Sequence, residues 1–100
     1  MTDFTKQVIE IIQNIPYGKV MTYGQIAAYA NNPRGARQVS RILSSMSNKY
    51  QLPWHRVINS KGGISLTGEP GYTQGELLSS EGVTVNDKQI SLKEYQYFLD

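Results

Sequence analysis

The chain contains no cysteine, one histidine and one tryptophan among its 100 residues. Without cysteine it can form no disulfide, no thiolate zinc site and no cysteine nucleophile. A single histidine supplies too few ligands for a zinc site. The sequence also lacks the glycine-rich loops that bind phosphate groups and the glycine-flanked serine of many hydrolases. We therefore expect neither a metal nor a cofactor.

Long hydrophobic runs are missing as well. No apolar run approaches the roughly 20 residues that a membrane span needs, and the N-terminal residues are too polar for a signal peptide. We expect a cytoplasmic protein without membrane contact, associated with the nucleoid if the source is bacterial. The length is that of one domain, residues 1–100, and a hydrophobic content of 39% suffices for one small core.

Acidic residues are absent from the middle of the chain, between residues 11 and 68. That segment carries basic residues only: Lys19, Arg34, Arg37, Arg41, Lys49, Arg56 and Lys61. Its net charge is +7 and that of the remainder is −5, which together give the overall +2. This asymmetry is typical of a surface that binds a polyanion, although a merely solvated basic surface has the same composition.

The first half of the chain is predicted to begin with two helices. Apolar residues recur at helical spacing over residues 4–15. Thr22 and Gln25 have the spacing of a capping box, in which each side chain satisfies a free backbone donor of the other residue. This pair predicts a second helix that ends near residues 31–33.

A third helix is predicted over about residues 34–46. It places Arg34, Arg37 and Arg41 on one face, because they are separated by three and four residues. Apolar residues fall on the broadly opposite face. Two short helices, the second lined with arginine, resemble a helix-turn-helix motif that binds DNA.

The second half is predicted to be less regular. The expected elements are a strand at 57–58, a turn at 59–63, a glycine-rich loop at 66–72, a helix opened by a capping box at 73–76, a hairpin at 83–90 and a last helix from residue 91 with Tyr95 and Phe98 as apolar contacts. The expected fold class is mainly α with small β elements.

The stretch LPWHRV, residues 52–57, contains the only tryptophan and the only histidine. With no nucleophile beside it, His55 is better interpreted as a buried residue that holds a turn by hydrogen bonds than as a catalytic base. Trp54 fits a core aromatic or the wall of a pocket for a flat ring, since stacking of a nucleobase contributes about 1–3 kcal/mol.

Four motifs in order carry a family resemblance: IPYGKVMTYGQIAAYA (15–30), RGARQVS (34–40), PWHRVINSKG (53–62) and LLSSEGV (77–83). Together they resemble the DNA-binding domain of O6-alkylguanine-DNA alkyltransferases, a winged helix-turn-helix-like fold. Those enzymes carry Pro-Cys-His-Arg-Val, and their cysteine accepts the alkyl group. Here Trp54 stands at the cysteine position. That substitution is typical of alkyltransferase-like proteins, which do not transfer alkyl groups.

The resemblance implies roles for residues at matching positions. Tyr23 is expected to crowd the phosphate of the target nucleotide and help rotate it outward. Arg37 would fill the gap that the flipped base leaves. His55 and Glu81 match the pair that activates the cysteine, and here we expect them to remain as pocket scaffolding. Arg56 matches an arginine that we expect to act as a structural brace.

The expected site has two parts. Tyr23, Arg34, Arg37 and Arg41 form the DNA-binding set; Tyr23, Trp54, His55, Arg56, Ser65, Leu66 and Glu81 form the alkylguanine pocket. The loop after Gly63 departs from the enzymes' pattern, which is compatible with a roomier pocket. No residue is expected to be catalytic.

The resemblance implies a monomer that binds double-stranded DNA containing O6-alkylguanine, flips the damaged base without alkyl transfer and marks the lesion for nucleotide excision repair proteins. Two alternatives remain open. One is an enzyme acting on alkylated bases, an alkyltransferase with another acceptor or a glycosylase. The other is a helix-turn-helix regulator that prefers a sequence rather than a lesion.

Overall fold

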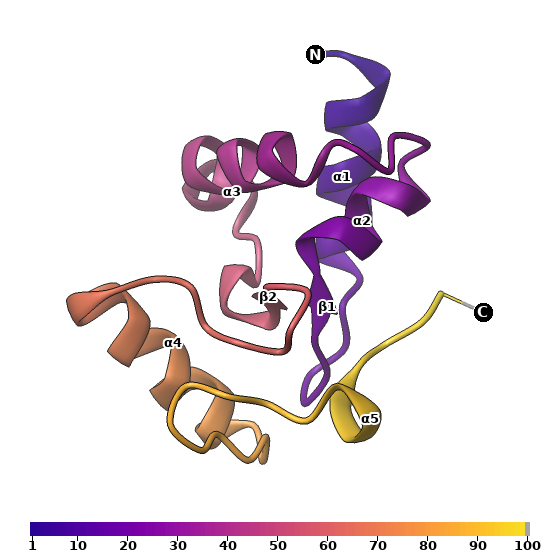
Figure 1. Ribbon diagram of the computed structural model, residues 1–100. Coiled ribbons are helices and arrows are strands. Elements are labelled where there is room, and N and C mark those ends of the chain that lie inside the picture. The colour runs from indigo at the N-terminus through magenta and orange to yellow at the C-terminus, as the bar shows by residue number, and fades with distance from the viewer. Residues whose placement is uncertain (100) are drawn as a thin grey trace.

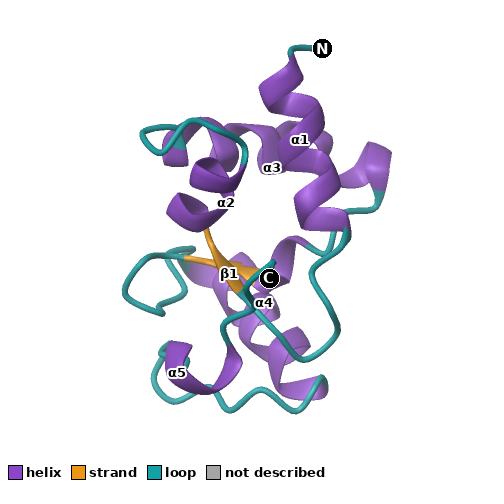
Figure 2. Ribbon diagram, turned by 90° about the vertical axis from the view of Figure 1, so that its right-hand side faces the viewer, coloured by secondary structure: helices purple, strands orange, loops and turns teal. Residues whose placement is uncertain are grey.

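Five α-helices and one two-stranded sheet make up the computed structural model, which describes residues 1–99 (Figure 1). The helices are α1 (Asp3–Gln13), α2 (Tyr23–Tyr29), α3 (Ala36–Tyr50), α4 (Gly68–Ser80) and α5 (Leu92–Tyr95); the strands are β1 (Met21–Thr22) and β2 (Val57–Ile58). Helices α1, α2 and α3 gather at one end of the molecule, α4 and α5 at the other, with the strands between them (Figure 2). The expected class, mainly α with small β elements, is confirmed.

Local sequence signals explain where the first two helices begin. The Thr2 side chain accepts a hydrogen bond from the Thr5 amide and so caps α1. The capping box predicted at the start of α2 is present, because the Thr22 hydroxyl and the Gln25 amide group bond each other's backbone N–H groups. Each cap satisfies donors that a helix start leaves unpaired.

The sheet separates two hydrophobic clusters. β1 pairs with β2 in parallel, Met21 opposite Val57 and Thr22 opposite Ile58. Successive side chains of a strand point to opposite faces. Met21 and Val57 therefore join the cluster of α1, α2 and α3, whereas Ile58 joins the cluster beneath α4. The strand at 57–58 was predicted, but nothing local in the sequence identifies its partner 36 residues earlier.

The arginine-rich helix differs from its predicted bounds. It begins at Ala36, so Arg34 lies in the preceding turn, and it continues to Tyr50 instead of ending near 46. Gln51 then adopts a left-handed conformation with φ of 53° and ends the helix. The extension adds one full turn, and that turn proves to line the site described below.

The prediction of a loop at 66–72 was wrong from residue 68 onward. Helix α4 begins at Gly68, so residues 73–76 lie inside it and form no capping box. Pro70 is tolerated because it sits in the first turn, where its backbone needs no N–H donor. The glycines and proline that favour a loop thus occupy the start of a helix.

The C-terminal predictions held only in part. The antiparallel bridge between Asn86 and Gln89 marks the turn of the expected hairpin, but Gln89 also pairs with Gly63 and the segment 83–85 is not a strand. Helix α5 is a single turn. Tyr95 packs against the second cluster, whereas Phe98 is 59% exposed and is not an apolar contact.

Within residues 1–99, no helix combines the length and the apolar character that crossing a membrane requires.

Candidate DNA-binding surface and base pocket

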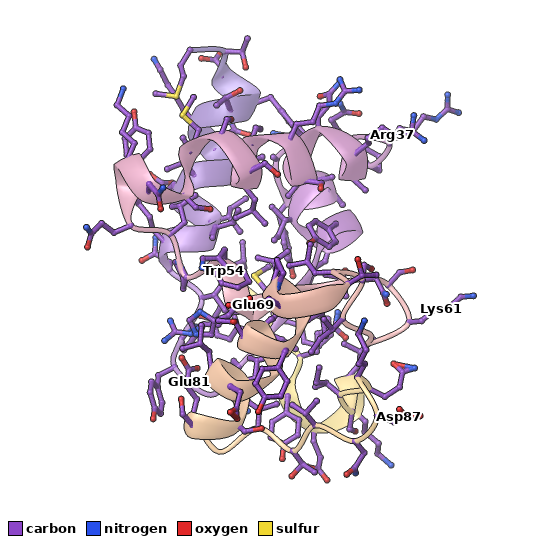
Figure 3. All side chains as sticks on the ribbon, turned by 90° about the vertical axis from the view of Figure 1, so that its left-hand side faces the viewer. Arg37, Trp54, Lys61, Glu69, Glu81 and Asp87 are labelled. Carbon is purple, nitrogen blue, oxygen red and sulfur yellow. The ribbon has the colours of Figure 1, made fainter. Side chains whose placement is uncertain are left out.

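A cavity of about 270 Å³ opens between α3 and the start of α4. Its lining residues are Tyr23, Ser40, Leu43, Ser44, Ser47, Asn48, Trp54, Leu66 and Pro70. Trp54 also borders an adjacent hollow of about 410 Å³ with Glu69, Pro70 and Thr73. Figure 3 shows Trp54 between the ribbons of α3 and α4, with Glu69 beside it. The indole thus forms a wall of the cavity and is only partly buried.

The lining of the cavity is polar on one side and apolar on the other. Ser40, Ser44, Ser47 and Asn48 all come from α3, where their spacing of three to four residues places them on one stripe. Trp54, Leu66 and Pro70 supply apolar surface. An apolar lining with a few placed polar groups is the usual character of a site for a small organic ring.

The arginine surface adjoins this cavity along α3. Arg34, Ala36, Arg37, Gln38 and Arg41 line a separate hollow, and the three arginines are exposed. Ser40 and Ser44 follow Arg37 at helical spacing, so the stripe that begins with arginine continues into the cavity. A polyanion lying on the arginines would therefore pass the mouth of the pocket.

Tyr23 stands at the first position of α2 and lines the cavity. Burial raises the pKa of its phenol above the ordinary value of 10.0. Like any phenol near neutral pH, the hydroxyl is uncharged and can donate a hydrogen bond. A neutral donor can approach a phosphate without charge repulsion.

Behind Trp54, three charged or polar side chains form a hydrogen-bonded cluster. His55 Nε2 lies 2.6 Å from Glu81 Oε2, and Arg56 Nη2 lies 2.8 Å from the same oxygen. Arg56 Nε bonds both carboxylate oxygens at 3.0 and 3.1 Å. An ionised carboxylate only accepts hydrogen bonds, so the Nε2 of His55 must be the donor. The pairing of His55 with Glu81 leaves neither group available inside the cavity.

Arg56 links this cluster to the rest of the fold. Its Nη1 donates to the carbonyl of Ile15 at 2.9 Å, just after α1, and its guanidinium lies 5.7 Å from the centre of the Tyr17 ring. The Gly18 amide donates to Glu81 Oε1 at 2.8 Å. This geometry connects the segment after α1, the turn Trp54–Arg56 and the end of α4.

The Glu81 carboxyl has a strongly altered pKa. Burial would raise it, but hydrogen bonds from Arg56, the Gly18 amide and His55 outweigh burial and lower the pKa from 4.5 to about 2. A lowered folded-state pKa stabilises the fold above the unfolded-state value and is lost as the pH falls.

The pH dependence of unfolding should report this carboxyl. We expect the free energy of unfolding of the wild type to fall more steeply between about pH 4.5 and 2 than that of Glu81→Gln, because only the wild type takes up a proton at this position. Urea titrations at a series of pH values measure the difference. Parallel curves for the two proteins over that interval would contradict the assignment.

The structure separates the predicted pocket residues into two groups. Tyr23, Trp54 and Leu66 line the cavity. His55, Arg56 and Glu81 are absent from its lining, because their polar groups bond one another behind Trp54. Ser65, also predicted there, is exposed and accepts a hydrogen bond from the Asn59 side chain at 2.9 Å.

Sequence reasoning missed six lining residues: Ser40, Leu43, Ser44, Ser47, Asn48 and Pro70. Five lie on α3 in register with Arg37 or one residue aside, a spacing that the sequence displays for Ser40, Leu43 and Ser44, whereas Ser47 and Asn48 lie beyond the predicted end of the helix. Pro70 was missed because its segment was interpreted as a loop.

Comparison with known proteins places this fold in a family. Residues 3–83 match the model of the DNA-binding domain of 6-O-methylguanine DNA methyltransferase. The DNA base-flipping protein of Escherichia coli (strain K12) is 44% identical over 95 residues, which cover 94% of this chain and 74% of that protein. Alkyltransferase-like protein 1 of Schizosaccharomyces pombe is 43% identical over 100 residues, covering 96% and 89%.

Among solved structures, the crystal structure of S. pombe Atl1 in complex with damaged DNA containing O6-carboxymethylguanine superposes with a TM-score of 0.87 and 37% sequence identity, over 98% of this chain and 97% of that one. The sequence relatives and this structure cover 94–98% of the chain, and the family model covers residues 3–83. The protein belongs to the alkyltransferase-like members of the family that shares the DNA-binding domain of 6-O-methylguanine DNA methyltransferase.

Proposed function

We propose that this protein binds double-stranded DNA containing O6-alkylguanine, rotates the damaged base into the cavity at Trp54 and holds it without alkyl transfer. The observation that carries the proposal is the position of Trp54. The indole lines a cavity next to an exposed arginine surface, at the place where the family's enzymes carry their reactive cysteine. The relatives named for base flipping and the Atl1 complex with damaged DNA support it.

Binding begins with electrostatics. Arg34, Arg37 and Arg41 attract the phosphate backbone and position α3 on the duplex, which contributes affinity without sequence preference. Lys61, at the turn after β2, extends from the same side of the molecule as Arg37 (Figure 3) and supplies a further cation for the backbone. In sequence, six of the eight acidic residues lie from residue 69 onward, and one of them, Glu69, borders the hollow next to Trp54.

Alkylation favours base flipping in two ways, because it destabilises the paired base and stabilises the base in the cavity. Extruding a base costs a few kcal/mol, and Arg37 offsets part of this cost by filling the vacated stack. An alkyl group on the exocyclic oxygen weakens pairing with cytosine, so the damaged guanine leaves the helix more readily. Inside the cavity, each buried methylene contributes about 0.8 kcal/mol, and Trp54 offers a surface for stacking.

No step of this account breaks a covalent bond. The chain has no cysteine, and His55 and Glu81 are engaged with each other and with Arg56. We infer that the cluster serves as scaffolding for the Trp54 wall. A protein that binds a lesion without reversing it must pass it on, so the stable complex would mark damage for nucleotide excision repair proteins, in the cytoplasm or nucleoid, with residues 1–100 acting as one monomeric domain.

Replacing Arg37 by alanine should weaken binding to both damaged and undamaged duplexes, because a cation near the phosphate backbone is lost. For damaged DNA the affinity should fall about tenfold, because the group that fills the vacated base stack is lost as well. Fluorescence anisotropy with labelled duplexes measures both affinities. Lys6→Ala, which removes an exposed lysine of α1 that lines neither the cavity nor the arginine hollow, is the matched control. Equal effects of the two substitutions would remove Arg37 from the interface.

A further inference from the structure

Residues beyond the matched family domain form hydrogen bonds with the segment that leads into one wall of the cavity. The match ends at residue 83, yet the segment after it pairs with the chain that leads into the pocket. The Ile64 amide donates to the Lys88 carbonyl at 2.9 Å, and the Ile90 amide donates to the Gly62 carbonyl at 2.8 Å. The position of residue 88 is therefore fixed relative to residues 62–64.

The turn between Asn86 and Gln89 directs the Lys88 side chain. Asp87 and Lys88 both have left-handed backbone conformations, with φ of 52° and 65°. Neither residue is glycine, so this conformation is sterically costly. From this turn the Lys88 ammonium donates to the Leu66 carbonyl at 2.7 Å.

Helix α4 approaches the Leu66 carbonyl from a second side, and the bond to Lys88 lies at the exposed surface. A Cβ atom on Gly71 would lie 2.3 Å from the Leu66 oxygen and 3.7 Å from Lys88 Nζ, so only glycine allows this approach. The carbonyl is therefore held between the Lys88 ammonium and the first turn of α4. The side chain of the same residue lines the cavity with Trp54 and Pro70.

We propose that Lys88 is a positioning residue for the base pocket: by binding the Leu66 carbonyl, it holds the Leu66 side chain in the cavity wall opposite α3. The inference rests on the proposed function for its effect on lesion binding. Its effect on the pocket itself is independent of that function, because Trp54, the only tryptophan, reports the cavity by fluorescence.

The test compares Lys88→Met, Lys88→Arg and Lys93→Met in the full chain. Methionine keeps an unbranched apolar stem and removes the donor, whereas arginine retains a donor and should rescue the wild-type behaviour. Lys93 is an exposed lysine on α5, so its substitution controls for the loss of one positive charge. Melting temperatures of all variants check that each is folded.

Two readouts decide the outcome. In DNA-free protein, acrylamide should quench Trp54 more strongly in Lys88→Met than in wild type, Lys88→Arg or Lys93→Met. With DNA, Lys88→Met should bind a duplex containing one O6-methylguanine about fivefold more weakly than Lys93→Met does, while the two variants bind the undamaged duplex equally.

The possible results separate the two proposals. Unchanged quenching in a folded Lys88→Met protein would overturn the role of Lys88. If the wild type prefers damaged DNA and Lys88→Met shows the same preference, the role of Lys88 in lesion binding is overturned even where quenching changes. If the wild type shows no lesion preference, the proposed function fails, and the quenching comparison alone still decides whether Lys88 holds the pocket wall.

Discussion

Glu81→Ala is expected to lower the free energy of unfolding by about 3 kcal/mol, because it leaves the partly buried Arg56 guanidinium without its carboxylate partner. The Glu81 side chain is 6% exposed and binds Arg56 through both carboxylate oxygens. Without it, the Arg56 guanidinium keeps only the Ile15 carbonyl among these partners. The Gly18 amide and His55 lose their acceptor as well. Urea unfolding followed by Trp54 fluorescence measures the loss.

Two comparisons make the Glu81 prediction specific. Glu76→Ala removes an exposed glutamate from the same helix and should change stability by less than about 0.5 kcal/mol. Glu81→Gln keeps the size and some acceptor capacity, so its loss should fall between the two. If Glu81→Ala unfolds at the same urea concentration as Glu76→Ala, the cluster contributes nothing to stability and cannot serve as scaffolding for the pocket.

Trp54→Ala is expected to remove most of the preference for damaged DNA. Stacking on an aromatic side chain contributes about 1–3 kcal/mol per base, so affinity for an O6-methylguanine duplex should fall about 10- to 100-fold. Binding to undamaged duplex should change little, because it depends on the arginine surface and not on the cavity. Anisotropy titrations with the two duplexes give both values.

Trp54→Phe is the matched variant for this prediction. Phenylalanine keeps a flat ring in the cavity wall and should retain an intermediate lesion preference. A Trp54→Ala protein that is folded and still discriminates as the wild type does would show that the base does not contact the indole. If both Trp54→Ala and Trp54→Phe discriminate as the wild type does, Trp54 is a core aromatic, which is the other interpretation of this residue.

Local signals in the sequence were sufficient for some elements. The capping residues Thr22 and Gln25 predicted the start of α2, and the arginine spacing predicted the exposed face of α3. These features depend on neighbours three or four residues apart, which the sequence displays directly. The first residue of α4 was not predictable in this way, because Gly68 and Pro70 have the composition of a loop.

Some residues of the site were predictable from the sequence, but their arrangement was not. The motif resemblance identified Trp54, His55 and Glu81, yet only the fold shows that His55 and Glu81 face away from the cavity. Contacts between distant segments decide this: Glu81 lies 26 residues from His55, and Lys88 lies 22 residues from Leu66. Such contacts form only when the two hydrophobic clusters assemble around the sheet.

The most direct test compares two duplexes that differ by one O6-methylguanine, with dissociation constants measured for the wild-type protein and the mass of protein and DNA recorded after incubation. The account predicts markedly tighter binding to the damaged duplex and no change in either mass, since Trp54 holds the base and accepts nothing from it. Equal affinities, a methyl group gained by the protein or a released base would contradict it.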